Sequence, residues 1–421
     1  MLDSYKKLFK NKNFLYLWMS QLLSQLTIQI ITFLLIVRLF NHTQSTIATS
    51  FLWLSYALPA IFIGPFASAA IDLLSKKKVL MLTNFIQSII IFIYSLIFSK
   101  SIFLLFGAVL FYSIVNQFYL PAELSTLPSV VKSNSLAKAN GLFFITQQAS
   151  LFAGFSIASP LGRFVGFKYS LYICSIFLFL AFLSVCFLSD IKKGIFVFKN
   201  IEDSFSEYFT QIINGYNYIK KNKTVLYPLL LLLGTQMCLS IVIVNLPVIA
   251  QELIKIKIEN AGSHIVLPAG LGAIIAAFSI PKYLDKGIRK IILIKRSIFL
   301  LSLCLILIAF LIPELPIKLI LWVSIFLIIL FGYAFVGIVI PTQTFLQEKT
   351  PIKFRGRVFG NYGFLLTIAS VFPIILSGTL TELLGIKTLS FIIGSLFLIF
   401  LIYISRLPKN AVFEKEILIN N

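Results

Sequence analysis

Charged residues are scarce in this chain of 421 residues: Asp, Glu, Lys and Arg together make up 12% of it. A soluble protein of this size would carry about twice that share. The 36 Lys and Arg residues outnumber the 15 Asp and Glu residues. They fall in short clusters between apolar blocks, and not on one continuous face as in a nucleic-acid-binding protein. This distribution disfavours both a soluble fold and a nucleic-acid partner.

Residue patterns that carry catalytic or metal chemistry are also lacking. No HExxH, GxSxG or Walker A pattern occurs, and no apolar block holds a pair of carboxylates. We therefore expect no enzymatic activity, cofactor or metal. A repeated filter sequence or charged rings, which would indicate a channel, are absent from the sequence as well. The four cysteines lie inside apolar blocks at spacings that match no metal site or disulfide framework: Cys174, Cys186, Cys238 and Cys304.

Long apolar runs dominate what is present, since 59% of the residues are hydrophobic. A helix needs about 20 such residues to cross a hydrocarbon layer about 30 Å thick. Within the apolar blocks the charged residues are Lys295, Arg296, Arg357 and Lys387, which all lie near a block end and can reach the interface. The blocks predict an all-α membrane protein with twelve transmembrane helices, at 15–37, 48–70, 79–98, 102–121, 141–162, 169–189, 226–248, 262–281, 292–312, 319–340, 357–379 and 386–405.

The basic clusters predict the orientation. An even number of spans puts both termini on one side, and that side holds Lys76-Lys77-Lys78, the run 282–296 and the run 349–357. The other side holds scattered single charges. Because cytoplasmic loops of membrane proteins are enriched in Lys and Arg, we expect cytoplasmic termini in a bacterial cell membrane.

One polar segment, 190–224, interrupts the alternation of spans and short loops. From Ile201 to Ile219 its apolar residues recur at helical spacing, which predicts an amphipathic helix on the inner membrane face. This helix is either a linker or a regulatory site. The expected domains are an N-terminal six-helix bundle at 1–189, the linker at 190–224 and a C-terminal six-helix bundle at 225–421.

The two halves contain matching patterns. An acid, three residues and a basic pair follow span two at Asp72-Leu-Leu-Ser-Lys76-Lys77 and span eight at Asp285-Lys-Gly-Ile-Arg289-Lys290. Span five with Gly154 and Gly166 similarly matches span eleven with Phe372 and Gly385. The common offset predicts a duplication of six helices, an architecture of membrane transporters.

The chain resembles the major facilitator superfamily, and more narrowly its drug-efflux branch with macrolide-efflux and enterobactin-exporter proteins. The resemblance is carried by Gly64-Pro65-Phe66-Ala67 leading to Asp72 and Lys76-Lys77-Lys78, by Pro121-Ala122 and Leu136-Ala137-Lys138-Ala139-Asn140, by Arg355-Gly356-Arg357 and by Gly378, Glu382 and Gly385. It implies two pseudo-symmetric bundles, transport by alternating access, and an antiporter that exports a small molecule.

The resemblance also implies conformational latches on the cytoplasmic side. Asp72, with Lys76 and Lys77, would contact the start of span eleven at Arg355 and Arg357, where free backbone N–H groups attract an anion. Asp285, with Arg289 and Lys290, would make the equivalent contact at the start of span five. The alternative is that Asp72 neutralises the neighbouring lysines.

Amide side chains within the spans are candidates for the substrate cavity, because a buried amide needs a partner or water. Hydrogen bonds between helices would use the same residues and are the alternative. The candidates are Gln21, Gln25, Gln29, Asn116, Gln117, Gln147, Gln236 and Asn245.

No carboxylate lies in the middle of a predicted span. The nearest acids, Glu123 and Glu252 at span ends, are the candidates for binding a coupling proton, unless transport is not proton-coupled. The 43 Phe and 16 Tyr residues favour an apolar, aromatic cavity and an amphiphilic substrate. We expect efflux, with membrane lipids as surroundings and no obligate protein partner. Uptake, lysolipid flipping and a receptor without transport are the alternatives.

Overall fold

The computed structural model describes residues 8–71, 74–98, 101–131, 133–189, 216 and 218–406, and every regular element in those ranges is a helix. Most of the amphipathic helix predicted at 201–219 lies outside these residues. Contacts divide the chain into two compact units, 1–44 with 51–206 and 45–50 with 207–421. The predicted borders at 189 and 225 stay predictions.

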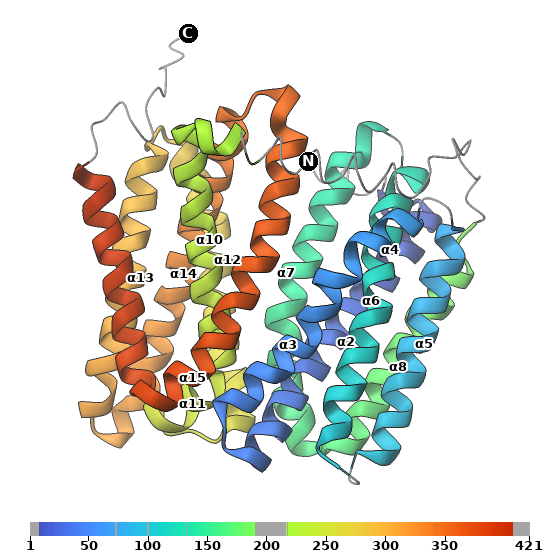
Figure 1. The fold of residues 1–421 in the computed structure, drawn as a ribbon, viewed down its shortest axis with the longest axis horizontal. Helices are drawn as coiled ribbons and strands as arrows, with labels where there is room; N and C mark the ends of the chain where they lie inside the picture. The colour runs from blue at the N-terminus through green and yellow to red at the C-terminus, as the bar shows by residue number, and fades with distance from the viewer. Residues whose placement is uncertain are drawn as a thin grey trace. The chain divides into compact units, whose positions relative to one another are not determined.

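The helices of the first half of the chain follow one another with short connections (Figure 1). They are α2 (Lys12–Thr43), α3 (Thr46–Phe62), α4 (Gly64–Ile71), α5 (Lys76–Ile97), α6 (Phe103–Val130), α7 (Ser133–Phe164) and α8 (Phe167–Cys186).

The second half repeats this organisation with additional short turns. Its helices are α10 (Lys223–Val244), α11 (Leu246–Val248), α12 (Leu267–Asp285), α13 (Lys290–Phe310), α14 (Ile317–Lys349) and α15 (Ile352–Arg406). Single turns lie at Ile249–Leu253, Ile258–Asn260, Gly262–Val266 and Ile312–Glu314.

Among the described residues, ten helical segments are long and apolar enough to cross a membrane, by length and composition. The α15 segment counts once there, but Gly385 interrupts it with a non-helical φ of 79° and so separates spans eleven and twelve. The second predicted span is present as α3 and α4, two shorter consecutive helices. The prediction of an all-α protein with two six-helix bundles is thereby confirmed.

Two glycines terminate helices in the same way in the two halves. Gly166 precedes α8 with a φ of 84° and a ψ of 161°, and Gly385 has a φ of 79° and a ψ of 153°. A side chain would be strained at this positive φ, whereas glycine adopts it freely. The turn between spans five and six therefore matches the turn between spans eleven and twelve, as the duplication predicts.

In the first unit, α2 packs against α7 and α8, and α5 packs against α6 and α8. A buried apolar cluster near the basic end of this unit includes Phe14, Leu17, Leu80 and Leu127 from three of these helices. The helices are thus held by packing of apolar side chains, with isolated polar pairs such as Ser88 and Ser175 between α5 and α8.

In the second unit, the backbones of α12 and α14 come into close contact where the two helices cross. A Cβ atom on Gly272 of α12 would collide with the backbone carbonyl of Ile329, and one on Gly332 of α14 would collide with that of Ala269. Small residues allow such close backbone approach between membrane helices, where van der Waals contact drives association. This pair of glycines fixes the crossing.

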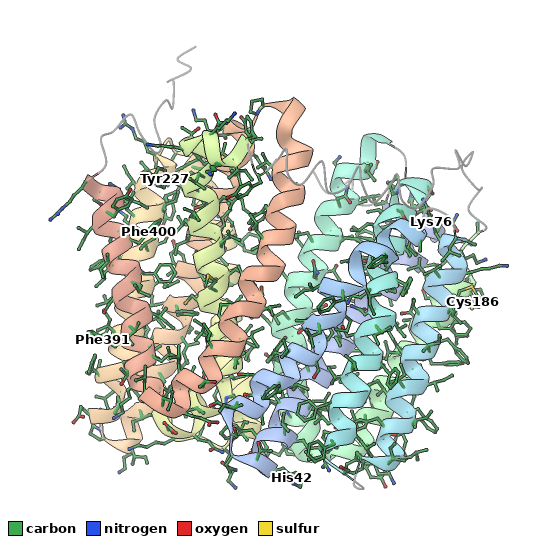
Figure 2. All side chains as sticks on the ribbon, viewed as in Figure 1. His42, Lys76, Cys186, Tyr227, Phe391 and Phe400 are labelled. Atoms are coloured by element: carbon green, nitrogen blue, oxygen red, sulfur yellow. The ribbon has the colours of Figure 1, made fainter. Side chains whose placement is uncertain are left out.

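Large apolar side chains cover the outward surfaces of both units (Figure 2). Phe391, labelled there, is 41% exposed, and Trp322 and Phe326 are more exposed still. A soluble protein would not leave so many such side chains in water. These surfaces fit contact with lipid chains.

The close crossing of α12 and α14 predicts that Gly332→Ala destabilises the protein. The added methyl group forces the two backbones apart, and overpacking of this kind costs about 1–3 kcal/mol. The thermal unfolding midpoint of the purified protein in detergent should fall. Gly234→Ala on α10 is the matched control, because no atom lies within 4 Å of its added Cβ. Equal midpoints for both variants would contradict the crossing.

Candidate functional site

Three glutamines of α2, which the sequence placed on one helix face, have different surroundings in the first unit. Gln21 is buried, and its Nε2 donates a hydrogen bond to the Phe143 carbonyl of α7 at 3.2 Å. Gln25 and Gln29 are half-buried. Neither has a hydrogen-bonding partner among the described residues. Gln21 thus joins two helices, while the other two amides remain available.

Helix α7, which packs beside these glutamines, adds a further amide. Gln147 is exposed and likewise has no hydrogen-bonding partner in the part of the chain that the structure describes. Close contact of the two helices depends on Gly154, since a Cβ there would collide with the Gln29 side chain. Amides left open on membrane-crossing helices fit a face that reaches water or substrate better than a face in lipid.

The two amides of α6 are engaged within the first unit. Asn116 accepts a hydrogen bond from Gln87 Nε2 at 3.3 Å and donates one to the Tyr56 hydroxyl at 3.2 Å. Gln117 Nε2 donates to the Ser113 carbonyl of its own helix at 3.1 Å. Asn116 therefore links α6 with α5 and α3, which corresponds to the structural alternative for such residues.

In the second unit, Asn245 is fully buried and both ends of its amide are occupied. Thr381 Oγ1 donates to Asn245 Oδ1 at 2.6 Å, and Asn245 Nδ2 donates to the Ile241 carbonyl at 2.9 Å. Gln236 is half-buried, and its Nε2 lies 3.4 Å from Ser370 Oγ. Gln236 is thus the more accessible of the two predicted cavity residues here.

A small apolar cavity of about 30 Å³ lies inside the first unit, between α2, α3, α5 and α6. It has room for about two water molecules, far less than the roughly 300–1,000 Å³ of a ligand pocket. Its walls include Trp53, Tyr56 and Tyr112, and none of the eight predicted cavity residues. This cavity is too small to hold a transported molecule.

Three of the predicted latch residues have no described side chain. Asp72 is among the residues left undescribed, and Arg355 and Arg357 lie on α15 with no described side chain. Lys76 begins α5, and its Nζ donates a hydrogen bond to the Ser125 carbonyl at 3.1 Å. That bond ties the first basic pair to the end of α6. The latch at Asp72 stays a prediction.

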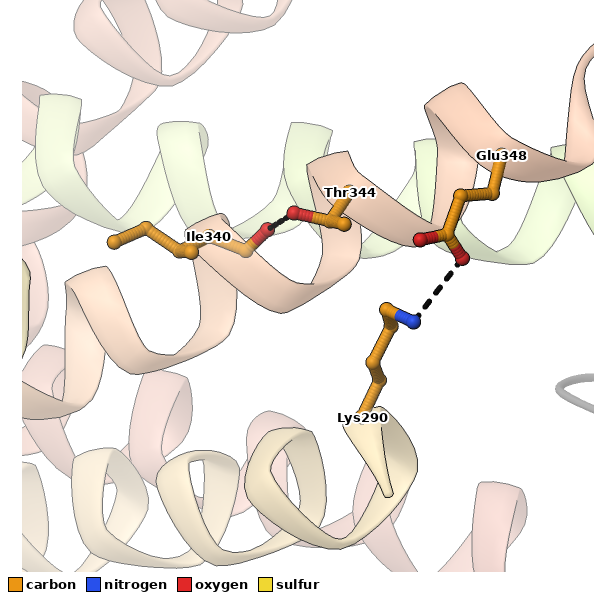
Figure 3. A network of polar contacts seen from close by, with 4 residues as sticks. All are labelled: Lys290, Ile340, Thr344 and Glu348. Atoms are coloured by element: carbon orange, nitrogen blue, oxygen red, sulfur yellow. Dashed lines mark hydrogen bonds and ion pairs between the residues drawn. The ribbon is translucent and has the colours of Figure 1, made fainter. Parts of the chain in front are cut away.

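The second set of latch residues surrounds the short connection between α12 and α13. Asp285 and Arg289 are exposed. Lys290 Nζ forms an ion pair with Glu348 Oε2 of α14 at 3.1 Å (Figure 3). One turn before Glu348, Thr344 Oγ1 bonds to the Ile340 carbonyl at 2.9 Å. Sequence reasoning missed Glu348. A usable signal was that this acid lies on the same predicted side of the membrane as the basic run 282–296.

Glu382, in the second unit, caps the N-terminus of α3. Sequence reasoning had given this carboxylate no structural role. Its Oε1 accepts hydrogen bonds from Ser45 Oγ at 2.6 Å and from the Ile47 backbone N–H at 3.1 Å. Residues 45–50, which include the first turn of α3, belong to that same unit. An anion at a helix N-terminus is stabilised by free N–H groups and the helix dipole. Glu382 thus holds the start of α3.

The two candidate proton-binding acids differ sharply. Glu252 is exposed. The sequence placed Glu123 just beyond the predicted span 102–121, whereas helix α6 continues to Val130, and Glu123 is buried with 1% exposure. The helix tolerates the internal Pro121 and Pro128, so the apolar block ends before the helix does. In the described ranges no three His, Cys, Asp or Glu side chains are grouped as a metal would require.

Apolar helices in two repeated six-helix halves, with amide side chains inside the spans, define a membrane transporter of the six-plus-six kind. The family model of the Major Facilitator Superfamily matches residues 17–373. The chain therefore belongs to the Major Facilitator Superfamily and is a multi-pass membrane transporter of the type that this family comprises.

Similar proteins agree at this level. The chain is 29% identical to the uncharacterised MFS-type transporter YjbB of Bacillus subtilis (strain 168) over 38% of this chain and 40% of that protein. It is 25% identical to the uncharacterised MFS-type transporter YfiS of the same organism, over 98% of this chain and 97% of that protein. A mutant of the nucleoside transporter NupG has the same fold, with a TM-score of 0.72 and 16% identity over 93% of this chain and 99% of NupG.

The Lys290–Glu348 pair predicts a small stability effect. Because the Glu348 side chain is 53% exposed, solvent screening limits the pair to about 1 kcal/mol or less. Lys290→Glu and Glu348→Lys should each lower the thermal midpoint, and the double variant should recover most of the loss. Lys286→Glu, an exposed neighbour, is the control. Strictly additive losses in the double variant would show that the two side chains do not interact.

Proposed function

We propose that this transporter is a secondary active exporter of small amphiphilic molecules, working by alternating access in the bacterial cell membrane with both termini in the cytoplasm. The observation that carries the proposal is the set of open amides in the first unit. Gln25 and Gln29 on α2 and Gln147 on α7 lie on apolar helices, are half-buried or exposed, and lack hydrogen-bonding partners among the described residues.

Such amides suit an amphiphilic substrate. The surrounding side chains of these helices are apolar, so they favour an apolar body, while each amide donates or accepts one hydrogen bond to a polar group. In the second unit, Gln236 and Ser370 supply a similar half-buried pair. Export is proposed because the chain as a whole resembles the drug-efflux branch, whereas Gly64-Pro65 with Asp72 is a signature of the whole superfamily.

The cycle would be biased by the latches at Asp72 and Asp285. Each carboxylate gains about 0.3–1 kcal/mol from a helix N-terminus, up to about 2 when partly buried. One kcal/mol changes a population ratio about fivefold, which biases an equilibrium between two states without freezing it. The pairing of Lys290 with Glu348 leaves Asp285 exposed and available for such a contact.

Export predicts that cells lacking the gene retain more of a substrate than cells that overproduce the protein. A panel of amphiphilic compounds should be screened in an efflux-deficient host, with retention measured directly. The variant Gln25→Leu with Gln29→Leu should lose about tenfold in transport, since each lost hydrogen bond costs about 0.5–1.5 kcal/mol. Gln251→Leu, an exposed glutamine outside α2, is the control. The reverse retention pattern would mean uptake, and no effect on any compound would favour a receptor.

The latch predicts that Asp72→Asn slows transport about fivefold while the protein inserts and folds normally, because the neutral amide loses the charge attraction to the start of α15. Initial rates of substrate export and the amount of membrane-inserted protein should be measured together. Transport at the full rate by normally inserted Asp72→Asn protein would leave the aspartate with the simpler role of neutralising nearby lysines.

A further inference from the structure

Glu123 is a buried carboxyl group with a single partner. Its side chain is 1% exposed within the first unit, and its Oε1 accepts a hydrogen bond from the Tyr119 hydroxyl one turn earlier on α6 at 3.0 Å. No further hydrogen bond or ion pair to Glu123 exists in the part of the chain that the structure describes. An ionised carboxylate without a counter-charge is very costly to bury, so such a group readily takes up a proton.

Cations lie on the helices packed against α6, but none is paired with Glu123. On α5, Lys76 is bound to the Ser125 carbonyl, and Lys77 and Lys78 follow it in the first turn. On α7 the basic residue near this end is Lys138, on α2 the titratable residues near this end are Lys12 and Tyr16, and α4 carries no titratable residue. The charge state of Glu123 is therefore not fixed by an ion pair with these groups.

Tyr119 connects Glu123 to a buried line of polar groups that crosses three helices. The Tyr119 hydroxyl lies 3.4 Å from Ser20 Oγ of α2, and Asn84 Nδ2 of α5 donates to Ser20 Oγ at 2.9 Å. Ser20 and Asn84 are both fully buried. Donors can thus point from Asn84 through Ser20 and Tyr119 to the Glu123 carboxylate, an arrangement that suits its unprotonated form.

The far end of this line holds acceptors that lack donors. Asn84 Oδ1 and Gln87 Oε1, one turn apart on α5, are buried without a hydrogen-bonding partner. A buried acceptor that is left unpaired destabilises the arrangement that contains it. When Glu123 is protonated, its O–H becomes a donor to Tyr119 and the line can reverse. Tyr119 then donates to Ser20, and Ser20 donates to Asn84 Oδ1 once the Asn84 amide has rotated.

We propose that Glu123 is the residue at which this transporter binds its coupling proton. Tyr119, Ser20 and Asn84 form a hydrogen-bonded line in which donors and acceptors exchange roles when the proton binds, so that protonation changes the contacts of α6 with α2 and α5. The step transfers one proton from hydronium in the solvent to the carboxylate, forming the carboxyl O–H bond and leaving a water molecule. Glu252 does not fit this role, because its exposed carboxylate is solvated in either state. The link to export rests on the proposed function; the proton site itself does not.

Infrared difference spectroscopy of the full-length protein in lipid nanodiscs tests the site without a substrate. When the pH is cycled, the wild type should show a C=O band of a protonated carboxyl group in apolar surroundings. Glu123→Gln should lose this band, and Glu252→Gln should keep it. Tyr119→Phe removes the hydrogen bond while leaving the carboxyl group, so the band should remain but change its frequency. Monodisperse elution of each variant establishes folding.

An unchanged band in folded Glu123→Gln, or no carboxyl band in the wild type, would overturn the proton site. A band that does not respond to Tyr119→Phe would overturn the hydrogen-bonded line. If the band behaves as expected and the retention screen shows no export, the proton site stands and the proposed function fails. With an exported compound in hand, Glu123→Gln protein in proteoliposomes should exchange it at equilibrium and lose accumulation driven by a pH gradient.

Discussion

The absence of water from the hydrocarbon layer is the constraint on which the rest of this structure depends. Backbone N–H and C=O groups there must bond within the protein, and helices satisfy them within one segment. Polar side chains face the same requirement, so most of those described inside the units bond to a neighbouring helix or to a carbonyl of their own. Asn245 with Thr381 and Ser88 with Ser175 are examples. A polar group that departs from this rule is informative.

Lipid also changes how helices are held together. Since lipid chains are as apolar as leucine, burial of apolar area gives little gain between helices, and close backbone approach becomes important. Gly272 and Gly332 provide it between α12 and α14, and Gly154 provides it between α2 and α7. The first pair lies in the second unit and the last glycine in the first. The repeated fold is therefore maintained in each unit by its own contacts, although the turns at Gly166 and Gly385 are alike.

How far the sequence predicts this structure follows from the same physics. Apolar runs predict spans reliably because insertion depends on local composition, and the six-plus-six organisation followed from matching residues such as Asp72 and Asp285. Helix ends were less predictable. The run after Leu120 becomes more polar at Glu123, yet α6 continues to Val130, because packing in the bundle and not hydropathy decides where it ends. Contacts between distant segments, such as Lys290 with Glu348, leave no periodic signal.

The role of each amide side chain is likewise hard to predict from the sequence. Composition marks Gln21, Gln29 and Asn245 alike as polar residues in apolar helices, and both a cavity and a helix contact would use them. Only tertiary structure separates them: Asn245 is fully bonded, Gln21 reaches the Phe143 carbonyl, and Gln29 lacks a described partner. The direction of transport is further removed from sequence, because it depends on the relative free energies of states that share one fold.

Three carboxylates differ in the groups that surround and balance their negative charge. Glu348, at an exposed helix end, has the Lys290 ammonium group 3.1 Å away. Glu382 accepts bonds from the first turn of α3, where the helix N-terminus favours an anion. Each of these two carboxylates therefore has a cation or backbone N–H donors beside it. Glu123 is buried more deeply than either and has a neutral phenol for its partner. A proton neutralises such a carboxylate without a charged side chain beside it, and this is the physical basis for proposing Glu123 as a proton-binding group.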